Sequence, residues 1–373
     1  MAISRLADIS VFIKILLFFF FRFDVPNFFF SPILAYLYIY IYIGSISNFH
    51  RLDIKLYGTV LSLFLYQIVG ILIEEKMNFV RRLESTLGLA NDSRSSEKIS
   101  KILPLATESS ECDPSKCLNS YDKKCFKLNS IDVKTPLWET AKPFDFQILV
   151  STGHHDWPFD AYDQPGTIFP NIASFDFSKY GTAKLNVTSL PIPLLDMDYK
   201  KFRKVDILIM PYFVWLRGVT IDNYEAVLSK VLDALVLKKQ KLSDLPKQIS
   251  GVSIAVDPFK SHVFICSHRT RDKRCGRTAP FMKKEFDCQL REDGLYRDSG
   301  DSRPDGVCVA FINHVGGHKF AANVLIYNKG GEFAWFARCT PLNVRPIIDE
   351  TLLKGRVFPD IARSVKKNDP ITW

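Results

Sequence analysis

Two cysteines and two histidines are the residues of this chain whose types and spacing indicate chemistry most clearly. Cys266 and Cys275 are separated by eight residues in FICSHRTRDKRCG, and His314 and His318 by three in FINHVGGHKFAANVLIY. The first residue of each pair follows an apolar run that predicts a β-strand. Thiolates and imidazoles together bind structural zinc, and they also bind [2Fe–2S] clusters in which two histidines replace two cysteines. The four residues therefore form a complete candidate ligand set.

The spacing leaves both kinds of metal site open. Small zinc modules usually place their cysteines about two to four residues apart, so the C-x8-C spacing is long for zinc. The H-x3-H half would suit zinc on a helix, where both rings share one face. Here Gly316 and Gly317 lie between the histidines, and paired glycines favour a tight loop. We therefore expect the imidazoles to converge from a turn. His268 is a further candidate ligand, which we interpret as a histidine of a charged loop.

These segments, together with TAPFMKKEF and GLYRD, resemble fungal proteins of the sucrase/ferredoxin-like family, from about residue 144 to residue 373. The resemblance implies a thioredoxin-like ferredoxin domain with a bis-histidinyl [2Fe–2S] cluster. It places Cys266 and Cys275 on one iron, and His314 and His318 on the other. The implied function is electron transfer in cellular redox homeostasis, as a carrier rather than a substrate-turnover enzyme. The alternative is a zinc-stabilised Cys2His2 interaction module without redox activity.

Histidine ligation has chemical consequences for such a cluster. Neutral imidazoles in place of two thiolates make the cluster less negative, which raises its reduction potential above that of all-cysteine ferredoxins. Each imidazole keeps a second ring nitrogen whose proton affinity depends on the charge of the iron. We therefore expect one-electron transfer that is coupled to proton uptake at His314 or His318.

The chain has 373 residues and a net charge of +9, without a continuous basic tract. Its densest basic cluster lies between the two cysteines and consists of Arg269, Arg271, Lys273 and Arg274. This cluster is a solvated loop or a docking patch for an acidic redox partner such as an electron-donating reductase. Nucleic acid is not an expected partner, because no interleaved aromatic residues or known binding motif accompany the cluster.

The other cysteines do not form the pattern of a disulfide framework. Cys112, Cys117 and Cys125 lie in a polar segment and are interpreted as surface cysteines, with metal binding or redox activity as the alternative. Cluster ligands must remain thiolates, so we expect a reducing compartment, the cytoplasm or also the nucleus. No nucleophile–base pair, paired carboxylates, P-loop or dinucleotide fingerprint indicates another activity.

The first 76 residues are strongly hydrophobic and differ from the rest of the chain. They contain two apolar runs near the minimum length of a spanning helix, which would make a membrane-anchored protein. They also have the Phe, Ile, Tyr and Leu bias of translated A/T-rich non-coding DNA. We interpret residues 1–76 as a gene-model artefact, with Met77 as the working start. A membrane is a partner only if these residues are translated.

The remaining chain predicts an α/β protein with a linker and two domains. Residues 77–142 are polar and predict a mostly disordered linker. Residues 143–250 predict a smaller N-terminal α/β domain, with strands in 144–152, 185–191 and 205–216 and a helix in 223–241. His154, His155, Asp156 and Trp157 form a polar cluster after the first of these strands, interpreted as a loop. No internal repeat is apparent in the sequence.

Residues 251–373 predict the thioredoxin-like [2Fe–2S] ferredoxin domain, in the order β-α-β-β-α. Its strands are expected in 252–256, 262–267, 306–314, 323–328 and 332–339. One helix is expected from Thr278 to Gly294, and another from Thr340. The C-terminal Trp373 resembles the tail by which client proteins engage the cytosolic iron–sulfur assembly and targeting machinery; packing on the domain is the alternative.

Overall fold

The computed structural model describes residues 89–121, 123–126, 131–298, 300–301 and 303–369. These residues belong to one compact unit of mixed α/β structure. The hydrophobic leader, Met77 and Trp373 lie outside the described residues, so their predictions are not addressed by the fold. In the part of the chain that is described, no helix is long and apolar enough to cross a membrane.

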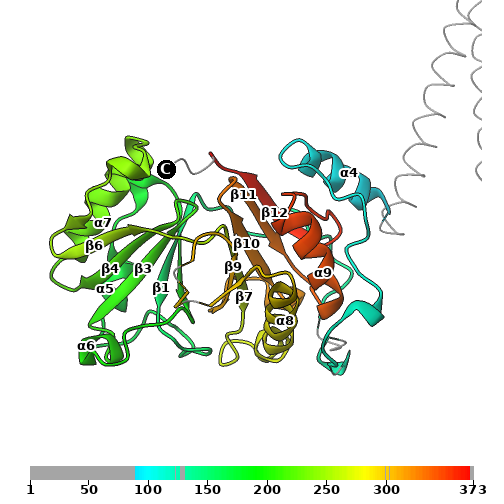
Figure 1. Cartoon of the computed structure of the whole chain (residues 1–373), viewed down its shortest axis with the longest axis horizontal. Coiled ribbons are helices and arrows are strands. Elements are labelled where there is room, and N and C mark those ends of the chain that lie inside the picture. Colours follow the sequence, from blue (N-terminus) through cyan, green and yellow to red (C-terminus); the bar gives the residue numbers. More distant parts are fainter. Residues whose placement is uncertain (1–88, 122, 127–130, 299, 302, 370–373) are drawn as a thin grey trace, which may run out of the picture. The chain divides into compact units, whose positions relative to one another are not determined.

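Twelve strands form one sheet in the order β12-β11-β10-β7-β9-β2-β1-β3-β4-β6-β5, with β8 beside β9 (Figure 1). The strands are β1 Phe146–Ser151, β2 Ala183–Thr188, β3 Lys204–Met210, β4 Val214–Thr220, β5 Gln248–Ile249, β6 Val252–Val256, β7 Ser261–Cys266, β8 Tyr296–Arg297, β9 Val307–Ile312, β10 Val324–Asn328, β11 Glu332–Phe336 and β12 Ala362–Lys367. The α-helices are α4 Leu89–Ser100, α5 Phe169–Ser174, α6 Met197–Lys200, α7 Tyr224–Leu232, α8 Lys273–Glu292 and α9 Val344–Pro346. Short π-helical segments, Asp233–Leu237 and Ile347–Leu352, continue α7 and α9.

The sheet consists of two halves with the same topology. In the first half β1 and β2 are parallel and joined through α5, β3 pairs with β1 antiparallel, and β4 and β6 follow outward. In the second half β7, β9, β10, β11 and β12 repeat these pairings, with α8 between β7 and β9. Each half is a β-α-β unit followed by a hairpin and a helix, the thioredoxin-like arrangement predicted for the C-terminal domain. The repeat is one of connectivity, which the residue pattern of the sequence did not reveal.

The two halves are joined at the carboxyl ends of β2 and β9. Thr188, the last residue of β2, pairs antiparallel with Ile312, the last residue of β9. The neighbours of this pair exchange two equivalent hydrogen bonds of 3.0 Å, from Ser189 N to Phe311 O and from Asn313 N to Val187 O. Because β1 is parallel to β2 and β7 to β9, the carboxyl ends of all four strands meet at this joint.

The inner faces of the two half-sheets pack on each other. The buried apolar cluster between them includes Leu149, Leu208 and Phe213 from the first half and Phe264, Leu325 and Trp335 from the second. The helices cover the outer faces, α5 and α7 on the first half and α8 and α9 on the second (Figure 1). Strands buried on both faces are apolar at nearly every position, which is why the sequence predicts them as continuous runs.

Two predicted elements differ from the structure in their bounds. The run over 205–216 was predicted as one strand, but it forms β3 and β4 with a turn at Pro211, because proline has no N–H to continue a strand ladder. The helix predicted from Thr278 begins earlier, at Lys273. The first half also extends through β6 to Val256, beyond the predicted domain boundary at residue 250.

The polar segment before β1 carries more structure in its described part than its composition predicts. Ile99 of α4 and Leu103 are buried in the main core. Farther along, Glu285 of α8 accepts hydrogen bonds from Leu118 N and Asn119 N, at 2.8 and 3.0 Å. A few apolar residues and one carboxylate thus attach an otherwise polar segment to the globular unit.

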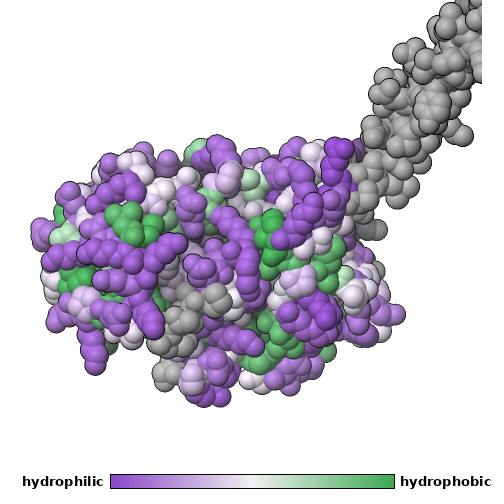
Figure 2. Space-filling model, turned by 90° about the horizontal axis from the view of Figure 1, so that it is seen from above, coloured by the Kyte–Doolittle hydropathy of each residue, from purple (hydrophilic) through white to green (hydrophobic). Residues whose placement is uncertain are grey.

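Figure 2 shows a face where hydrophilic residues predominate and hydrophobic ones gather in small separate patches. Such a distribution is ordinary for a folded domain whose apolar residues are already used in a core. The large apolar content of the described chain is accounted for by the two cores on the inner and outer faces of the sheet.

A buried ion pair lies in the core between the halves. His262 Nε2 of β7 is 3.1 Å from Asp257 Oδ1, and both side chains have no exposed surface. The two atoms are not aligned as a hydrogen bond, so we treat the contact as electrostatic. Trp215 Nε1 of β4 donates to Asp257 Oδ2 at 2.6 Å. Burial alone lowers the pKa of His262, but the charge of Asp257 outweighs it and raises that pKa to about 10.

This pair predicts a pH-dependent stability. The pKa of His262 is higher in the folded chain than in the unfolded chain, where it is about 6.5. The protonated histidine therefore contributes its full stabilisation below pH 6.5, and this stabilisation is lost as the pH rises toward 10. The lowered pKa of Asp257 has the opposite consequence, a loss of stability as the pH falls. Asp257→Asn removes the charge that keeps His262 protonated, so the ion pair is lost, and the free energy of unfolding at pH 7 is expected to fall by about 3–5 kcal/mol.

The measurement is guanidinium-induced unfolding at pH 7 and pH 9.5 for both proteins. The variant should lose less stability between these two pH values than the native chain. Glu97→Gln, which breaks an exposed ion pair with Lys101, is the control and should leave the midpoint unchanged. An equal pH response of Asp257→Asn and the native chain would contradict the assigned role of the pair.

Candidate metal centre

The two predicted cysteines come together at the joint. Cys266 is the last residue of β7, as predicted. Cys275 lies in the first turn of α8, which begins at Lys273 because the side chain of Asp272 accepts a hydrogen bond from Arg274 N at 2.9 Å. The sequence signal for this start was present, since an Asp directly precedes the helix, but Thr278 was preferred. Both cysteines are buried.

The two predicted histidines converge from a turn, as their glycines predict. Between them Gly316 and Gly317 have positive φ angles of 93° and 71°. The His314 and His318 rings lie with their centroids 5.1 Å apart and their planes inclined by 35°. A side chain at Gly317 would collide with Arg363, because an added Cβ would lie 2.5 Å from Nη2. The turn is therefore restricted to glycine by conformation and by space.

One nitrogen of each imidazole lacks a protein partner. Nδ1 of His314 and Nδ1 of His318 are buried, and neither makes a hydrogen bond in the described structure. A buried polar atom without a partner costs about 1–3 kcal/mol, and such an atom often marks a ligand position. The other nitrogen of His318, Nε2, lies 3.8 Å from Asp272 Oδ2, and this side chain is 43% exposed.

The thiols and the imidazoles act on each other electrostatically. A hydrogen bond from the Cys275 thiol lowers the pKa of Cys266 well below its usual range, and the neighbouring His314 adds to this effect against the opposing effect of burial. Cys275 lies at the amino-terminal end of α8, where the helix dipole favours negative charge. The hydrogen bond to Cys266 and burial, however, raise the pKa of the Cys275 thiol well above its usual range. The pair therefore favours a single thiolate, at Cys266, and the thiolate is the form that binds metals.

His268 holds the histidine turn in place and is not the charged-loop residue that we expected. It is buried, and its Nε2 lies 3.0 Å from both Trp157 O and Pro158 O. Carbonyl oxygens only accept, so Nε2 carries a proton. Its Nδ1 then accepts a hydrogen bond from His314 N at 3.3 Å. Both ring nitrogens are engaged in positioning the backbone.

Two cations, the half-buried Lys184 and the buried Arg363, lie beside the turn, and sequence reasoning missed both. Lys184 Nζ of β2 donates to Val315 O at 3.0 Å, and burial lowers the pKa of Lys184 to about 8. Arg363 Nη1 of β12 donates to Gly316 O at 3.0 Å, and burial lowers the pKa of Arg363 to about 10. Both come from strands distant in the sequence, and no local signal distinguishes them from surface cations.

The predicted polar cluster after β1 also reaches this place. Ser267 Oγ donates to His155 O at 2.7 Å, and Thr270 N and Oγ1 donate to the carboxylate of Asp156 at 3.0 and 2.8 Å. Loop 153–160 of the first half therefore supports the segment between the two cysteines. It was interpreted as a loop from the sequence, and its function in the structure is to brace this segment.

The remaining cysteines have other surroundings. All described cysteines are free, without a disulfide. Cys112 and Cys117 are half-buried neighbours whose thiols form a hydrogen bond, and the backbone N–H of Cys112 donates to Leu342 O at 2.9 Å. Burial raises the pKa of Cys112, so its thiol form is favoured.

The four candidate ligands lie as two pairs, one of thiols and one of imidazoles. Among the described residues, no group of three or more His, Cys, Asp or Glu side chains is placed to hold a metal ion. A histidine-ligated [2Fe–2S] cluster takes two protein ligands on each iron, so it needs two pairs. The thiol pair and the imidazole pair, with its two unpartnered nitrogens, provide the donor set that such a cluster requires.

Comparison with known proteins agrees with the sequence resemblance. Residues 137–364 match the sucrase/ferredoxin-like family. The chain belongs to this family. It is 39% identical over 288 residues to Actin patches distal protein 1 of Saccharomyces cerevisiae, and the alignment covers 72% of this chain and 89% of that protein.

Other relatives of the chain are less similar. Altered inheritance of mitochondria protein 32 of Clavispora lusitaniae is 36% identical over 104 residues, which is 28% of this chain and 34% of that protein. The protein of the same name from Candida glabrata is 25% identical over 254 residues, covering 61% and 74% of the two chains. No solved structure matches the chain.

The hydrogen bonds of His268 predict that this side chain stabilises the folded arrangement of the histidine turn. His268→Ala leaves His314 N and the carbonyl of Trp157 without their partner, so we expect the free energy of unfolding to fall by about 1–3 kcal/mol. Urea-induced unfolding of the two proteins measures this change. His154→Ala is the matched control, since His154 is an exposed histidine of the same bracing loop, and it should change stability less. Equal effects of the two variants would contradict the role of His268.

Proposed function

We propose that this chain is an electron-transfer protein that holds a [2Fe–2S] cluster through Cys266, Cys275, His314 and His318 and acts in cellular redox homeostasis. The observation that carries the proposal is the pairing of two buried, unpartnered imidazole nitrogens with a hydrogen-bonded pair of thiols. Membership of the sucrase/ferredoxin-like family supports it. The compartment proposed with it is the cytoplasm, because the ligand cysteines must stay reduced.

The bound cluster would accept and release one electron at a time. The protein's own residues would set how easily this occurs. Lys184 and Arg363 hold the histidine turn through its carbonyl oxygens, and both bring positive charge toward Cys266. Positive charge beside the ligands favours the reduced state, which carries one more negative charge. The proposed consequence is a reduction potential raised by the surroundings as well as by the imidazoles.

His318 is the proposed site of proton uptake. Its Nδ1 is the unpartnered nitrogen. Its Nε2 lies 3.8 Å from the carboxylate of Asp272, and the side chain of His318 is partly exposed. A proton gained at Nε2 would be stabilised by that carboxylate and could exchange with solvent. His314 is held more deeply, through its backbone N–H bonded to His268.

Zinc is the alternative occupant of the same four residues. A zinc-stabilised Cys2His2 interaction module would use the site as a structural link between β7, α8 and the histidine turn. It would carry no electron and would be colourless. Metal content therefore separates the two functions.

The first test is the metal content and visible spectrum of the full chain purified without oxygen. We expect a coloured protein with about two irons and two sulfides per chain. His314→Ala and Cys275→Ala should each lose or alter the visible absorption, because each removes one ligand. Cys288→Ala is the matched control, since this half-buried cysteine lies on α8 outside the ligand set. A colourless protein that binds one zinc would reject the electron-transfer function.

The second test is the reduction potential as a function of pH. Reduction increases the proton affinity of a ligand imidazole, so the potential should fall as the pH rises, by up to about 59 mV per pH unit for one proton and one electron. Asp272→Asn keeps a good helix N-cap and removes the charge beside His318. In this variant, the pH range over which the reduction potential changes should move to lower pH. A potential that does not change with pH would exclude proton coupling while leaving the cluster itself untouched.

Two partners belong to the proposal. An electron-donating reductase must supply the electron, and the cytosolic iron–sulfur assembly machinery would insert the cluster, with Trp373 as its recognition tail. Deletion of Trp373 is the corresponding variant, which should lower cluster occupancy in cells without unfolding the protein.

A further inference from the structure

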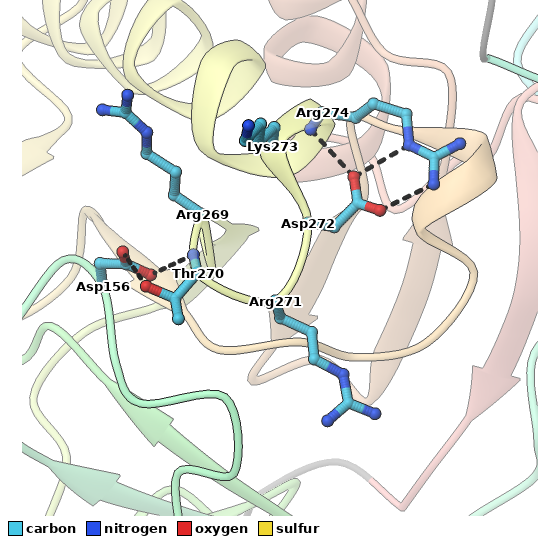
Figure 3. A pocket seen from close by; sticks show the side chains of 7 residues that line it. All are labelled: Asp156, Arg269, Thr270, Arg271, Asp272, Lys273 and Arg274. Atoms are coloured by element: carbon cyan, nitrogen blue, oxygen red, sulfur yellow. Dashed lines mark hydrogen bonds and ion pairs between the residues drawn. The ribbon is translucent and has the colours of Figure 1, made fainter.

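An open hollow of about 720 Å³ lies beside the candidate metal centre (Figure 3). It is lined by Asp156 and by the consecutive residues Arg269, Thr270, Arg271, Asp272, Lys273 and Arg274. This segment runs between the two ligand cysteines. The hollow therefore lies directly next to the site and is bordered by four cations.

The cationic side chains of this segment differ in how far they are exposed and held by neighbouring residues. Arg274 folds back onto Asp272, with Nη2 2.7 Å from Oδ2. Arg269, Arg271 and Lys273 have exposed side chains, and Figure 3 shows Arg269 and Arg271 extending away from the loop in different directions. Asp156 is occupied by Thr270 and braces the loop. The surface that remains accessible is therefore positive.

An exposed aromatic residue adjoins these cations. Phe159 of the bracing loop is 60% exposed, and the Arg271 guanidinium lies 3.9 Å from the centre of its ring. Arg271 Nη1 also donates to Phe159 O at 3.1 Å, which fixes the pair. Arginine and aromatic side chains in one cluster are typical of the residues that contribute most to protein–protein binding.

A candidate ligand with a solvent-exposed side chain lies next to the hollow. His318 is 43% exposed, and its Nε2 lies beside Asp272, which lines the hollow. Electron transfer between proteins requires the donor group to come close to the acceptor. A donor seated on the hollow would face His318, whose side chain reaches the surface.

We propose that Arg269, Arg271, Lys273 and Phe159 form the docking surface for an acidic protein that donates single electrons. This inference rests on the proposed electron-transfer function and names the chemistry of the partner. In each encounter the reduced donor would lose one electron, and the cluster held by the four candidate ligands would gain it. Complementary charge accelerates encounter and orients the donor, while Phe159 supplies an apolar contact at the edge.

A nucleic acid fits this surface less well. The cationic segment is short, it is interrupted by Asp272 and bordered by Asp156, and it does not continue as a stripe with several stacking aromatic residues. A compact acidic patch on a folded protein matches its size and its mixture of charge and apolar surface.

The experiment uses the full chain and a reduced acidic flavodoxin as the probe donor. Binding is measured by titration at several salt concentrations, and single-turnover reduction of the cluster is followed by visible absorption. We expect both the affinity and the second-order rate to fall as salt rises. The double variant Arg271→Glu/Lys273→Glu should weaken binding and slow reduction by about tenfold or more at low salt, and should lose most of the salt dependence. Phe159→Ala should weaken binding with its salt dependence intact.

The control variant is Lys238→Glu/Lys239→Glu, which makes the same change of charge at exposed lysines after α7. It should leave binding and reduction as in the native chain. A small neutral reductant should reduce all variants at equal rates, which shows that their clusters are intact.

Three outcomes would overturn the docking surface: no salt-dependent binding of flavodoxin, equal effects of the two double variants, or equally tight binding of a single-stranded oligonucleotide that the Arg271→Glu/Lys273→Glu variant abolishes. Failure of the proposed function gives a different result. In that case flavodoxin binds with the predicted salt and variant dependence, but no electron is transferred and no cluster absorption is present.

Discussion

The antiparallel joint between β2 and β9 is the constraint on which the rest of the molecule depends. Two thioredoxin-like halves meet there through Thr188 and Ile312, and the carboxyl ends of β1, β2, β7 and β9 converge as a consequence. Ligands in α/β sheets commonly bind beyond the carboxyl ends of strands, where loops are free to diverge. At this joint the loops of one half contact those of the other, which closes the candidate metal centre on both sides.

The local charge balance follows from this geometry. Burial of a thiolate at Cys266 is unfavourable by itself, because a charge loses its hydration. The structure offsets this cost with the Cys275 thiol, the amino-terminal end of α8, and the cations Lys184 and Arg363. These groups come from α8, β2 and β12, so the charge balance exists only in the assembled fold. A metal ion or cluster at the same place would use the same compensation.

The sequence predicted the parts of the site that depend on local pattern. Continuous apolar runs located β7, β9 and β10, and paired glycines indicated the turn that brings His314 and His318 together. The start of α8 was missed because Thr278 and Pro280 imitate a helix start inside the helix. Lys184, Arg363 and the positioning role of His268 could not be found, because they depend on contacts between residues up to 131 positions apart and on which loops face each other. The repeated topology was hidden for a related reason: connectivity is shared between the halves while the residues at equivalent positions differ.

The two halves differ in the residues at equivalent strand positions, and they also differ in their roles. By strand register Ser151 of β1 corresponds to Cys266 of β7, and Gln147 to His262, so the first half keeps the framework without the cysteine ligand. Its residues instead contact and stabilise the second half. Its β2 supplies Lys184, its loop 153–160 holds His268 and Thr270, and its inner face covers the apolar side of β7 and β10. A domain consisting of residues 251–373 alone would expose that face and lose these bonds. The metal centre is therefore a property of both halves, although all four candidate ligands belong to one.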